Sequence, residues 1–164
     1  MTDKVYNVLI LCTGNSARSI LGEALINHLG QGRFKGYSAG SQPAGKVNLY
    51  ALKTLEKHGL DTAGYRSKSW DEFGVAGAPQ MDFVFTVCGS AAGETCPLWP
   101  GTPLRAHWGL EDPAGVGSND DEAMAAFAKA YQIIHRRVSR FVALDIAALG
   151  EDELKAELAA IGKA

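Results

Sequence analysis

Near the N-terminus the chain reads Val8-Leu9-Ile10-Leu11-Cys12-Thr13-Gly14-Asn15-Ser16-Ala17-Arg18-Ser19. The apolar residues at the start are typical of a buried strand, and the residues after Ser19 have the spacing of an amphipathic helix. Small and turn-forming side chains lie between the two. The sequence therefore predicts a strand, a tight loop and a helix start, which is the first step of an α/β fold with a parallel sheet.

The predicted loop has the residues of an oxyanion site that contains a sulfur nucleophile. Five residues separate Cys12 from Arg18, so successive backbone N–H groups can curl around one anion while the guanidinium binds it through two N–H groups. Gly14 and Asn15 tolerate the positive φ that such a loop requires. The same field favours thiolate over thiol, so we expect Cys12 to be nucleophilic at neutral pH. The expected oxyanion-binding residues are Thr13, Gly14, Asn15, Ser16, Ala17, Arg18 and Ser19.

A less specific interpretation is that Cys12 is a small buried residue at a strand end. That interpretation leaves Gly14, Asn15, Arg18 and Ser19 unexplained as a group. Ser19 can both start the helix and donate a hydrogen bond toward the thiolate. The loop is not a Walker loop, because the Gly-Lys-Ser/Thr ending is missing.

The composition favours one cytoplasmic domain. A chain of 164 residues, taken as a single domain over 1–164, can bury its own core without disulfides. A formal net charge of −2 and a pI near 6.1 give no electrostatic reason to expect nucleic acid or an anionic membrane as a partner. We find neither a signal-peptide pattern nor an apolar stretch near the roughly 20 residues that span a bilayer. Three cysteines leave at least one thiol free, which favours catalytic or redox thiols.

Strand-like and helix-like segments alternate along the rest of the chain. Strands are predicted at 34–38, 83–87 and 104–107, and helices at about 19–29, 48–58, 119–144 and 151–161. Ser69-Trp70-Asp71-Glu72 has the spacing of a capping box and predicts a further short helix. This order predicts a mainly parallel sheet with helices on both faces, a core over about 5–148 and a peripheral C-terminal helix over 149–164. Cys12, Cys88 and the loop after His107 would then meet at the carboxyl ends of the strands.

A second pair of thiols lies in Cys88-Gly89-Ser90-Ala91-Ala92-Gly93-Glu94-Thr95-Cys96-Pro97. Seven residues, small or flexible, separate the two thiols, so the loop can join them by bending or partly unfolding. Disulfide exchange with an outside reductant is the favoured interpretation. A zinc site of Cys88, Cys96 and His107 lacks the short paired-cysteine spacing of structural zinc, and two unrelated buried cysteines are the remaining alternative.

Asp112 is the candidate general acid. It precedes Pro113, which biases it toward an extended conformation that could aim its carboxyl at the anion loop. A carboxyl near a thiolate and a bound oxyanion tends to keep its proton, which suits protonation of a departing oxygen. A plain surface turn at Asp112-Pro113 is the alternative, and Glu111 competes for the acid role.

Taken together, these motifs resemble the low-molecular-weight protein tyrosine phosphatase family. Cys-x5-Arg-Ser at the first strand end and the distant Asp112-Pro113 carry that resemblance. The chain is similar to the arsenate reductases of that fold, of the thioredoxin-coupled type, through Thr86-Val87-Cys88, Cys96-Pro97 and Ala106-His107-Trp108-Gly109. The resemblance runs from about Val8 to Leu144 and implies a three-layer, flavodoxin-like α/β sandwich around a central parallel sheet of four strands.

The resemblance also implies a reaction. Cys12 would attack arsenate while Asp112 assists the loss of water, Cys88 would attack Cys12 with release of arsenite, and Cys96 would attack Cys88. Thioredoxin, or glutathione with glutaredoxin, would reduce the resulting Cys88–Cys96 disulfide. No cofactor or catalytic metal is implied apart from a structural potassium ion that some relatives bind, for which Asn15, Glu23 and Ser38 match part of the site. From the residues alone, we expect Asn15 to pin the loop and Glu23 to satisfy polar groups behind it.

Two other classes of function stay open. A phosphatase would hydrolyse phosphate monoesters through a phosphocysteine, although Ala114-Gly115-Val116-Gly117 lacks the aromatic residues that would hold a phosphotyrosine ring. A redox-sensing anion-binding module would show no turnover. Of the scattered cations, we interpret two groups as mainly solvent-facing: Arg66, Lys68 and Arg105, which could also steer an oxyanion, and Arg136, Arg137 and Arg140 on one helix.

Overall fold

The computed structural model describes residues 5–12, 14–62, 64–73, 77–87, 103–110, 113 and 117–163. A 3-10 helix, η1, accompanies the α-helices and strands. The elements follow the chain in the order β1 (Tyr6–Cys12), α1 (Arg18–Gly30), β2 (Phe34–Gly40), α2 (Leu49–Lys57), η1 (Trp70–Phe73), β3 (Phe83–Thr86), β4 (Leu104–His107), α3 (Asp120–Val142) and α4 (Glu151–Gly162).

The four strands form one parallel sheet in the order β2-β1-β3-β4. β1 lies inside the sheet, with Cys12 opposite Gly40 of β2 and Leu11 opposite Thr86 of β3. The chain leaves β1 toward β2 on one side and later returns to β3 on the other. The carboxyl end of β1 is therefore the point where strand order reverses, which is where open α/β sheets bind ligands. The predicted α/β fold with a parallel four-stranded sheet is confirmed.

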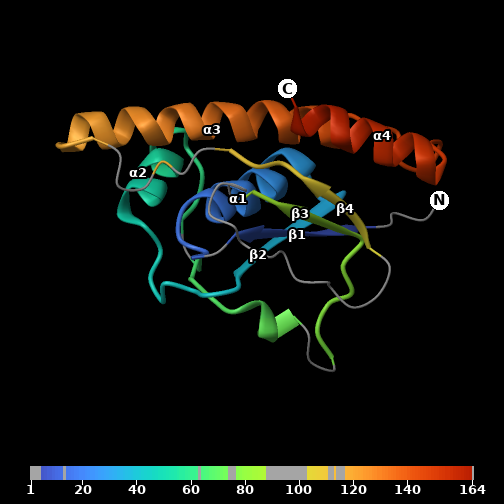
Figure 1. The fold of residues 1–164 in the computed structure, drawn as a ribbon, viewed down its shortest axis with the longest axis horizontal. Coiled ribbons are helices and arrows are strands. Elements are labelled where there is room, and N and C mark those ends of the chain that lie inside the picture. Colours follow the sequence, from blue (N-terminus) through green and yellow to red (C-terminus); the bar gives the residue numbers. More distant parts are fainter. Residues whose placement is uncertain are drawn as a thin grey trace.

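The two faces of the sheet carry cores of different size. On one face Val8, Ile10 and Cys12 pack with buried residues of all the α-helices. On the other face Leu9 and Leu11 belong to a smaller cluster that packs against η1. Figure 1 shows α1, α3 and α4 above the sheet and η1 below it. Helices were predicted for both faces, and within the described residues it is the short η1 that covers the second face.

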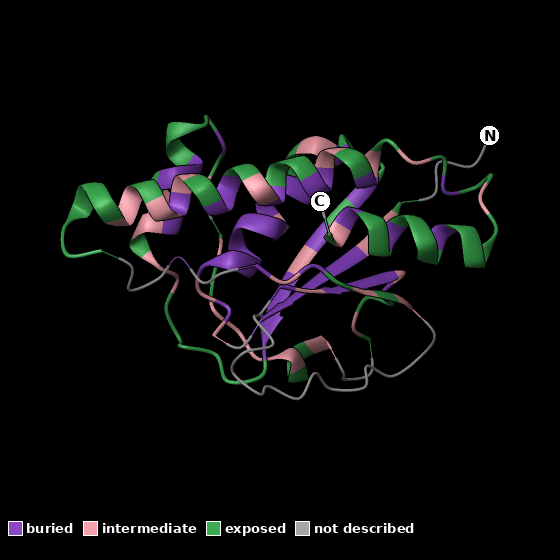
Figure 2. Ribbon diagram, turned by 45° about the horizontal axis from the view of Figure 1, so that its top comes forward, coloured by how far each residue is buried: buried purple, intermediate pink, exposed green. Residues whose placement is uncertain are grey.

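The predicted helices and strands are confirmed, with small shifts at their ends. Asn48 and Asn119 lie just before α2 and α3, and their side chains accept hydrogen bonds from the N–H groups of Tyr50 and Glu122. Ser69 Oγ accepts from the Asp71 N–H at 3.1 Å, and the segment that follows is a 3-10 rather than an α-helix. Along α3, a buried stripe faces the sheet and an exposed side faces outward (Figure 2).

Glycine in β2 lets α1 approach the sheet closely. A Cβ atom on Gly36 would lie 2.7 Å from the Glu23 carbonyl oxygen and 2.9 Å from Ile26 Cβ. The Asn27 side chain reinforces the contact, because it accepts from the Gly36 N–H at 2.9 Å and donates to the Gly36 carbonyl at 3.3 Å. Helix α1 is therefore fixed on the strands that end beside Cys12.

Helix α4 packs against the end of β4. Leu154, Leu158 and Ile161 are buried in the larger core cluster. Trp108 Nε1 donates to the Leu158 carbonyl at 3.0 Å. These contacts join the last helix to the segment that follows β4.

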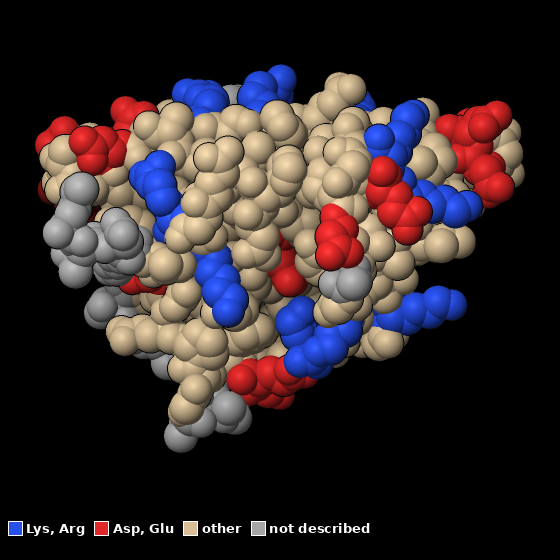
Figure 3. All heavy atoms as spheres, turned by 180° about the vertical axis from the view of Figure 1, so that it is seen from behind, with Lys and Arg blue, Asp and Glu red and all other residues tan. Residues whose placement is uncertain are grey.

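Charged side chains of both signs are interspersed on the surface. On the face shown in Figure 3, Lys and Arg side chains stand among Asp and Glu side chains. Within the described ranges, the helices all lack the combination of length and apolar character needed to cross a bilayer.

Candidate functional site: an anion loop after the central strand

Cys12 is the last residue of β1 and lies at the switch point of the sheet. Its side chain is buried, with 7% of its surface exposed, and faces the same core as α1. The loop that follows returns the chain directly to α1, whose first residue is Arg18. Strand and helix therefore present a thiol and a helix N-terminus at one place.

The loop is held from outside through its carbonyl groups. The Gly14 carbonyl accepts hydrogen bonds from the Ala44 N–H and from Ser67 Oγ, both at 2.9 Å. The Ser16 carbonyl accepts from the Asn48 N–H at 2.8 Å. Because these carbonyl groups point toward the surrounding scaffold, the loop has a fixed shape.

Asn15 fixes the loop from inside. It is fully buried and takes the predicted positive φ, at 47°, whereas Gly14 does not. Its Oδ1 accepts from the Lys68 N–H at 2.9 Å, and its Nδ2 donates to Ser19 Oγ at 2.8 Å. Because the Ser19 hydroxyl accepts from Asn15, its own hydrogen remains available to donate elsewhere.

The N–H groups of Gly14–Ala17 have no hydrogen-bond acceptor within the part of the chain that the structure describes. At the N-cap of α1, Ala17 offers no side-chain cap, and the first turn has no acidic residue. A helix N-terminus without a cap or an acidic side chain carries open donors and partial positive charge, which favours an anion.

The Arg18 side chain is buried and joins the loop to two other strands. Its Nη1 donates to the Val87 carbonyl at 3.3 Å and to the Leu110 carbonyl at 3.1 Å. These carbonyls follow β3 and β4, so one guanidinium connects the ends of β1, β3 and β4. The predicted role of Arg18 in gripping an anion is thus accompanied by a structural role that the sequence did not indicate.

The prediction that Arg137 faces solvent is wrong. It is buried, and its Nη1 donates to the Trp108 carbonyl at 2.7 Å and to the Gly109 carbonyl at 3.3 Å. Burial and the neighbouring Arg136 lower its pKa from the usual arginine value. Arg18 and Arg137 together hold the carbonyls of residues 108–110, which lead toward the predicted acid.

Several predicted site residues lie outside the described residues. They are Thr13, Cys88, Cys96, Glu111 and Asp112. His107 is described, and its Nδ1 is hydrogen bonded to Thr86 Oγ1 at 2.6 Å.

Glu23, Ser38 and Lys68 form a polar cluster behind the loop. Ser38 Oγ donates to Glu23 Oε1. Lys68 Nζ lies 3.7 Å from Glu23 Oε1 and donates to Ser38 Oγ at 3.5 Å and to the Arg66 carbonyl at 3.1 Å. Burial raises the pKa of the Glu23 carboxyl and lowers that of the Lys68 ammonium, because lost hydration outweighs the attraction between the charges. Lys68 is therefore not the solvent-facing cation that the sequence suggested.

The same cluster contains the side chains that match a potassium site. Glu23 and Ser38 contact the ammonium of Lys68, and Asn15 Oδ1 accepts from the Lys68 backbone. A potassium ion between these oxygens would meet a like charge on Lys68. The residues present do not fit a potassium ion while Lys68 is charged.

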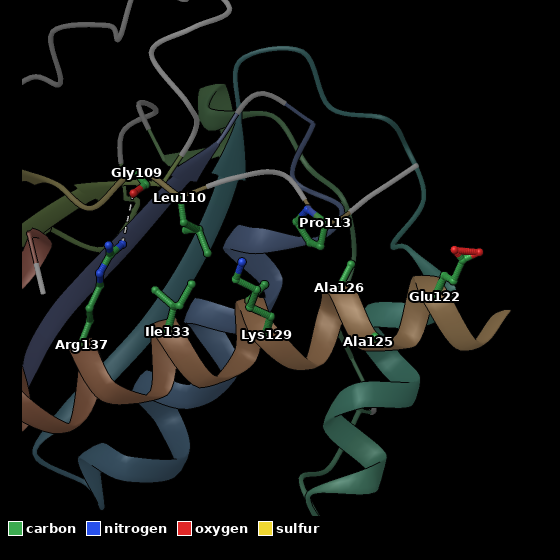
Figure 4. A pocket seen from close by; sticks show the side chains of 10 residues that line it. Gly109, Leu110, Pro113, Glu122, Ala125, Ala126, Lys129, Ile133 and Arg137 are labelled. Carbon is green, nitrogen blue, oxygen red and sulfur yellow. Dashed lines mark hydrogen bonds between the residues drawn. The ribbon is translucent and has the colours of Figure 1, made fainter. Parts of the chain in front are cut away.

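A separate cavity of about 580 Å³ lies between α3 and the segment after β4 (Figure 4). Leu110, Pro113 and Ile133 give it apolar walls, and Arg137 lies at one end. Its described lining includes no residue of the loop at 14–19.

Comparisons with known proteins agree with this geometry. The family model of low molecular weight phosphotyrosine protein phosphatases matches residues 7–158. An arsenate reductase of Shouchella clausii is 34% identical over 134 residues, which are 82% of this chain and 93% of that protein. The crystal structure of an arsenate reductase from Archaeoglobus fulgidus has a TM-score of 0.68 and 28% identity, and the match covers 84% of this chain and 99% of that one. An arsenate reductase solved in a phosphate-binding state has a TM-score of 0.70 and 27% identity, with 84% and 97% covered.

Proposed function

The chain belongs to the low molecular weight phosphotyrosine protein phosphatase family, and we propose that it is an arsenate reductase. Its substrate is arsenate, which has the tetrahedral shape and charge of phosphate. Curated arsenate reductases match most of this chain, and one arsenate reductase with a similar structure was solved in a phosphate-binding state. A loop that accepts phosphate also suits arsenate.

The first step is nucleophilic attack by Cys12 on arsenic. The Cys12 thiolate forms an S–As bond, one arsenate oxygen leaves as water, and Asp112 supplies a proton to that oxygen. The open N–H groups of Gly14–Ala17 and the Arg18 guanidinium stabilise the negative charge on the remaining oxygens. Ser19 can donate its hydroxyl hydrogen to the thiolate, since that hydroxyl accepts from Asn15.

The next steps supply two electrons to arsenic. The Cys88 thiolate attacks Cys12 Sγ, and the electron pair of the S–As bond goes to arsenic, which leaves as arsenite in the +3 state. Cys96 then attacks Cys88 and releases the Cys12 thiolate, which leaves a Cys88–Cys96 disulfide. Either the dithiol of thioredoxin or two molecules of glutathione acting through glutaredoxin then return the two electrons and reduce the disulfide. This exchange belongs in the cytoplasm, where NADPH-linked systems keep thiols reduced.

One observation supports the proposal most strongly. The Gly14 and Ser16 carbonyl groups of the loop are bound to the scaffold, while no described residue accepts a hydrogen bond from the N–H groups of Gly14–Ala17 at the uncapped helix start. A cysteine that is merely buried at a strand end does not require that arrangement. An oxyanion does, because it needs several donors directed at one point.

Arsenate-dependent NADPH oxidation by the purified protein tests the proposal. Parallel assays contain thioredoxin with its reductase, or glutathione with glutaredoxin and glutathione reductase. We expect steady oxidation with one system, which identifies the donor, and its loss in Cys12→Ser, Cys88→Ser and Cys96→Ser. Absence of arsenate-dependent oxidation with both systems would refute the proposal.

Hydrolysis of p-nitrophenyl phosphate without a reductant separates the reductase from a phosphatase. A phosphatase needs Cys12 but not the other thiols, so Cys88→Ser and Cys96→Ser would leave that hydrolysis unchanged. A phosphatase would therefore lose phosphate ester hydrolysis in Cys12→Ser alone. A reductase loses arsenate reduction in Cys12→Ser, Cys88→Ser and Cys96→Ser.

A further inference from the structure

Lys68 connects the anion loop to the elements around it. Its backbone N–H donates to Asn15 in the loop, and its carbonyl accepts from the Gly40 N–H at the end of β2. Its ammonium contacts Glu23 of α1 and Ser38 of β2. One residue thus touches the loop, the helix that starts from it and a neighbouring strand.

The environment of the ammonium is a set of oxygen atoms. The Glu23 carboxylate, the Ser38 hydroxyl and the Arg66 carbonyl lie 3.7, 3.5 and 3.1 Å from Lys68 Nζ. The Lys68 side chain is 9% exposed and that of Glu23 is 16% exposed, so water screens their attraction only weakly. By contrast, the nearby ion pair of Arg66 with Glu72 is open to solvent, with 62% and 42% of the side chains exposed.

We propose that the Lys68 ammonium is an internal cation that positions the anion loop, in the place where an alkali cation would otherwise be needed. It balances the charge of Glu23 in α1. Its contact with the Arg66 carbonyl holds the segment 66–68 in place, so that the Lys68 backbone N–H can bind Asn15. Lys68 is a positioning residue, because Asn15 and Ser19 lie between it and the anion site. The inference rests on anion binding by the loop, which is part of the proposed function.

The chemistry of the cluster predicts what happens when the ammonium is removed. A carboxylate, a hydroxyl and a backbone carbonyl are ligands that can replace the hydration shell of a monovalent cation. Lys68→Ala leaves these oxygens around an empty space, so potassium or ammonium from solution can take the position. Lys68→Met removes the charge but fills the space, so the same ions cannot enter.

Phosphate protection of Cys12 measures anion binding without arsenate or a redoxin. In a Cys88→Ser, Cys96→Ser background Cys12 is the single remaining thiol, and inorganic phosphate slows its alkylation by iodoacetamide. We expect the parent to bind phosphate equally well in potassium, sodium and choline chloride at one ionic strength. In choline chloride Lys68→Ala should bind phosphate about tenfold more weakly, the usual scale for removing a group that orients a binding residue.

Recovery in potassium or ammonium chloride separates positioning by a cation from a general loss of structure. Lys68→Ala should recover in either salt, Lys68→Met should stay weak in all salts, and the exposed Lys46→Ala should match the parent throughout. A folded Lys68→Ala protein that binds phosphate normally in choline chloride, or that neither ion restores, overturns the proposal. A parent that itself requires potassium also overturns it. Because the parent measurement needs no Lys68 variant and no arsenate, a folding defect or failure of the reductase activity leaves the test intact.

Discussion

Replacing Asn15 by alanine tests whether a single buried side chain sets the shape of the anion loop. The change removes two hydrogen bonds and leaves the Lys68 N–H without its acceptor in a partly buried place. It also places alanine at φ 47°, a conformation that asparagine tolerates better. Lost bonds, the unsatisfied donor and the backbone conformation together predict a loss of about 3 kcal/mol in unfolding free energy.

Urea unfolding followed by tryptophan fluorescence measures this loss, with two matched variants. Asn15→Gly loses the same bonds but accepts the positive φ, so it should be more stable than Asn15→Ala by about 1 kcal/mol. Gln31 also has a positive φ, at 48°, but is exposed, so Gln31→Ala should stay within about 0.5 kcal/mol of the parent. An Asn15→Ala protein that also stays within about 0.5 kcal/mol would refute this account of the loop.

Three further predictions concern the scaffold around the site. Arg137→Met should lower the unfolding free energy by about 2 kcal/mol and slow arsenate reduction, because the Trp108 and Gly109 carbonyls lose a charged donor. The control is Arg136→Met, because Arg136 is exposed. Equal effects of the two substitutions would contradict the role of Arg137. Gly36→Ala should cost about 2 kcal/mol in urea unfolding, since its Cβ would press on the α1 backbone, whereas Lys35→Ala on the same strand should be nearly neutral. Because burial raises the pKa of Glu23, the folded state binds a proton at this carboxyl more tightly than the unfolded state does. The stability that this group contributes is therefore present at low pH and is lost as pH rises through the pKa of the folded state. Unfolding of the parent and of Glu23→Gln at pH 5 and pH 7 should therefore show the parent gaining relative stability at the lower pH, and the opposite trend would show that the carboxyl is not desolvated.

The sequence contains clear signals for the regular elements. Apolar runs and helical spacing predict β1, α1 and α3 closely, and Asn48 and Asn119 mark helix starts because their side chains can cap N–H groups. The loop after Cys12 is also predictable, since residue types that accept positive φ are few. These features depend on local interactions, which is why local sequence indicates them.

Buried charges are harder to predict because they depend on contacts far apart in the chain. Arg136, Arg137 and Arg140 look alike in the sequence, yet Arg137 alone among them is buried. A signal was present: Arg137 lies three residues after Ile134 and four before Phe141, on the apolar stripe of α3. For Lys68 no such pattern exists, since its partners belong to α1 and β2 and only the folded chain brings them to it.

The alternation of side chains along β1 has a consequence for how related chains can differ in length. Cys12 shares a face with Val8 and Ile10, whereas Leu9 and Leu11 face the opposite core. One inserted residue between Val8 and Cys12 would turn the thiol toward η1 or push the apolar side chains out of register. The exposed segment 41–43, which precedes the Ala44 N–H that binds the loop, has no such alternation to preserve. Insertions and deletions during divergence should therefore accumulate in that segment, while the distance in sequence from Val8 to Arg18 stays constant.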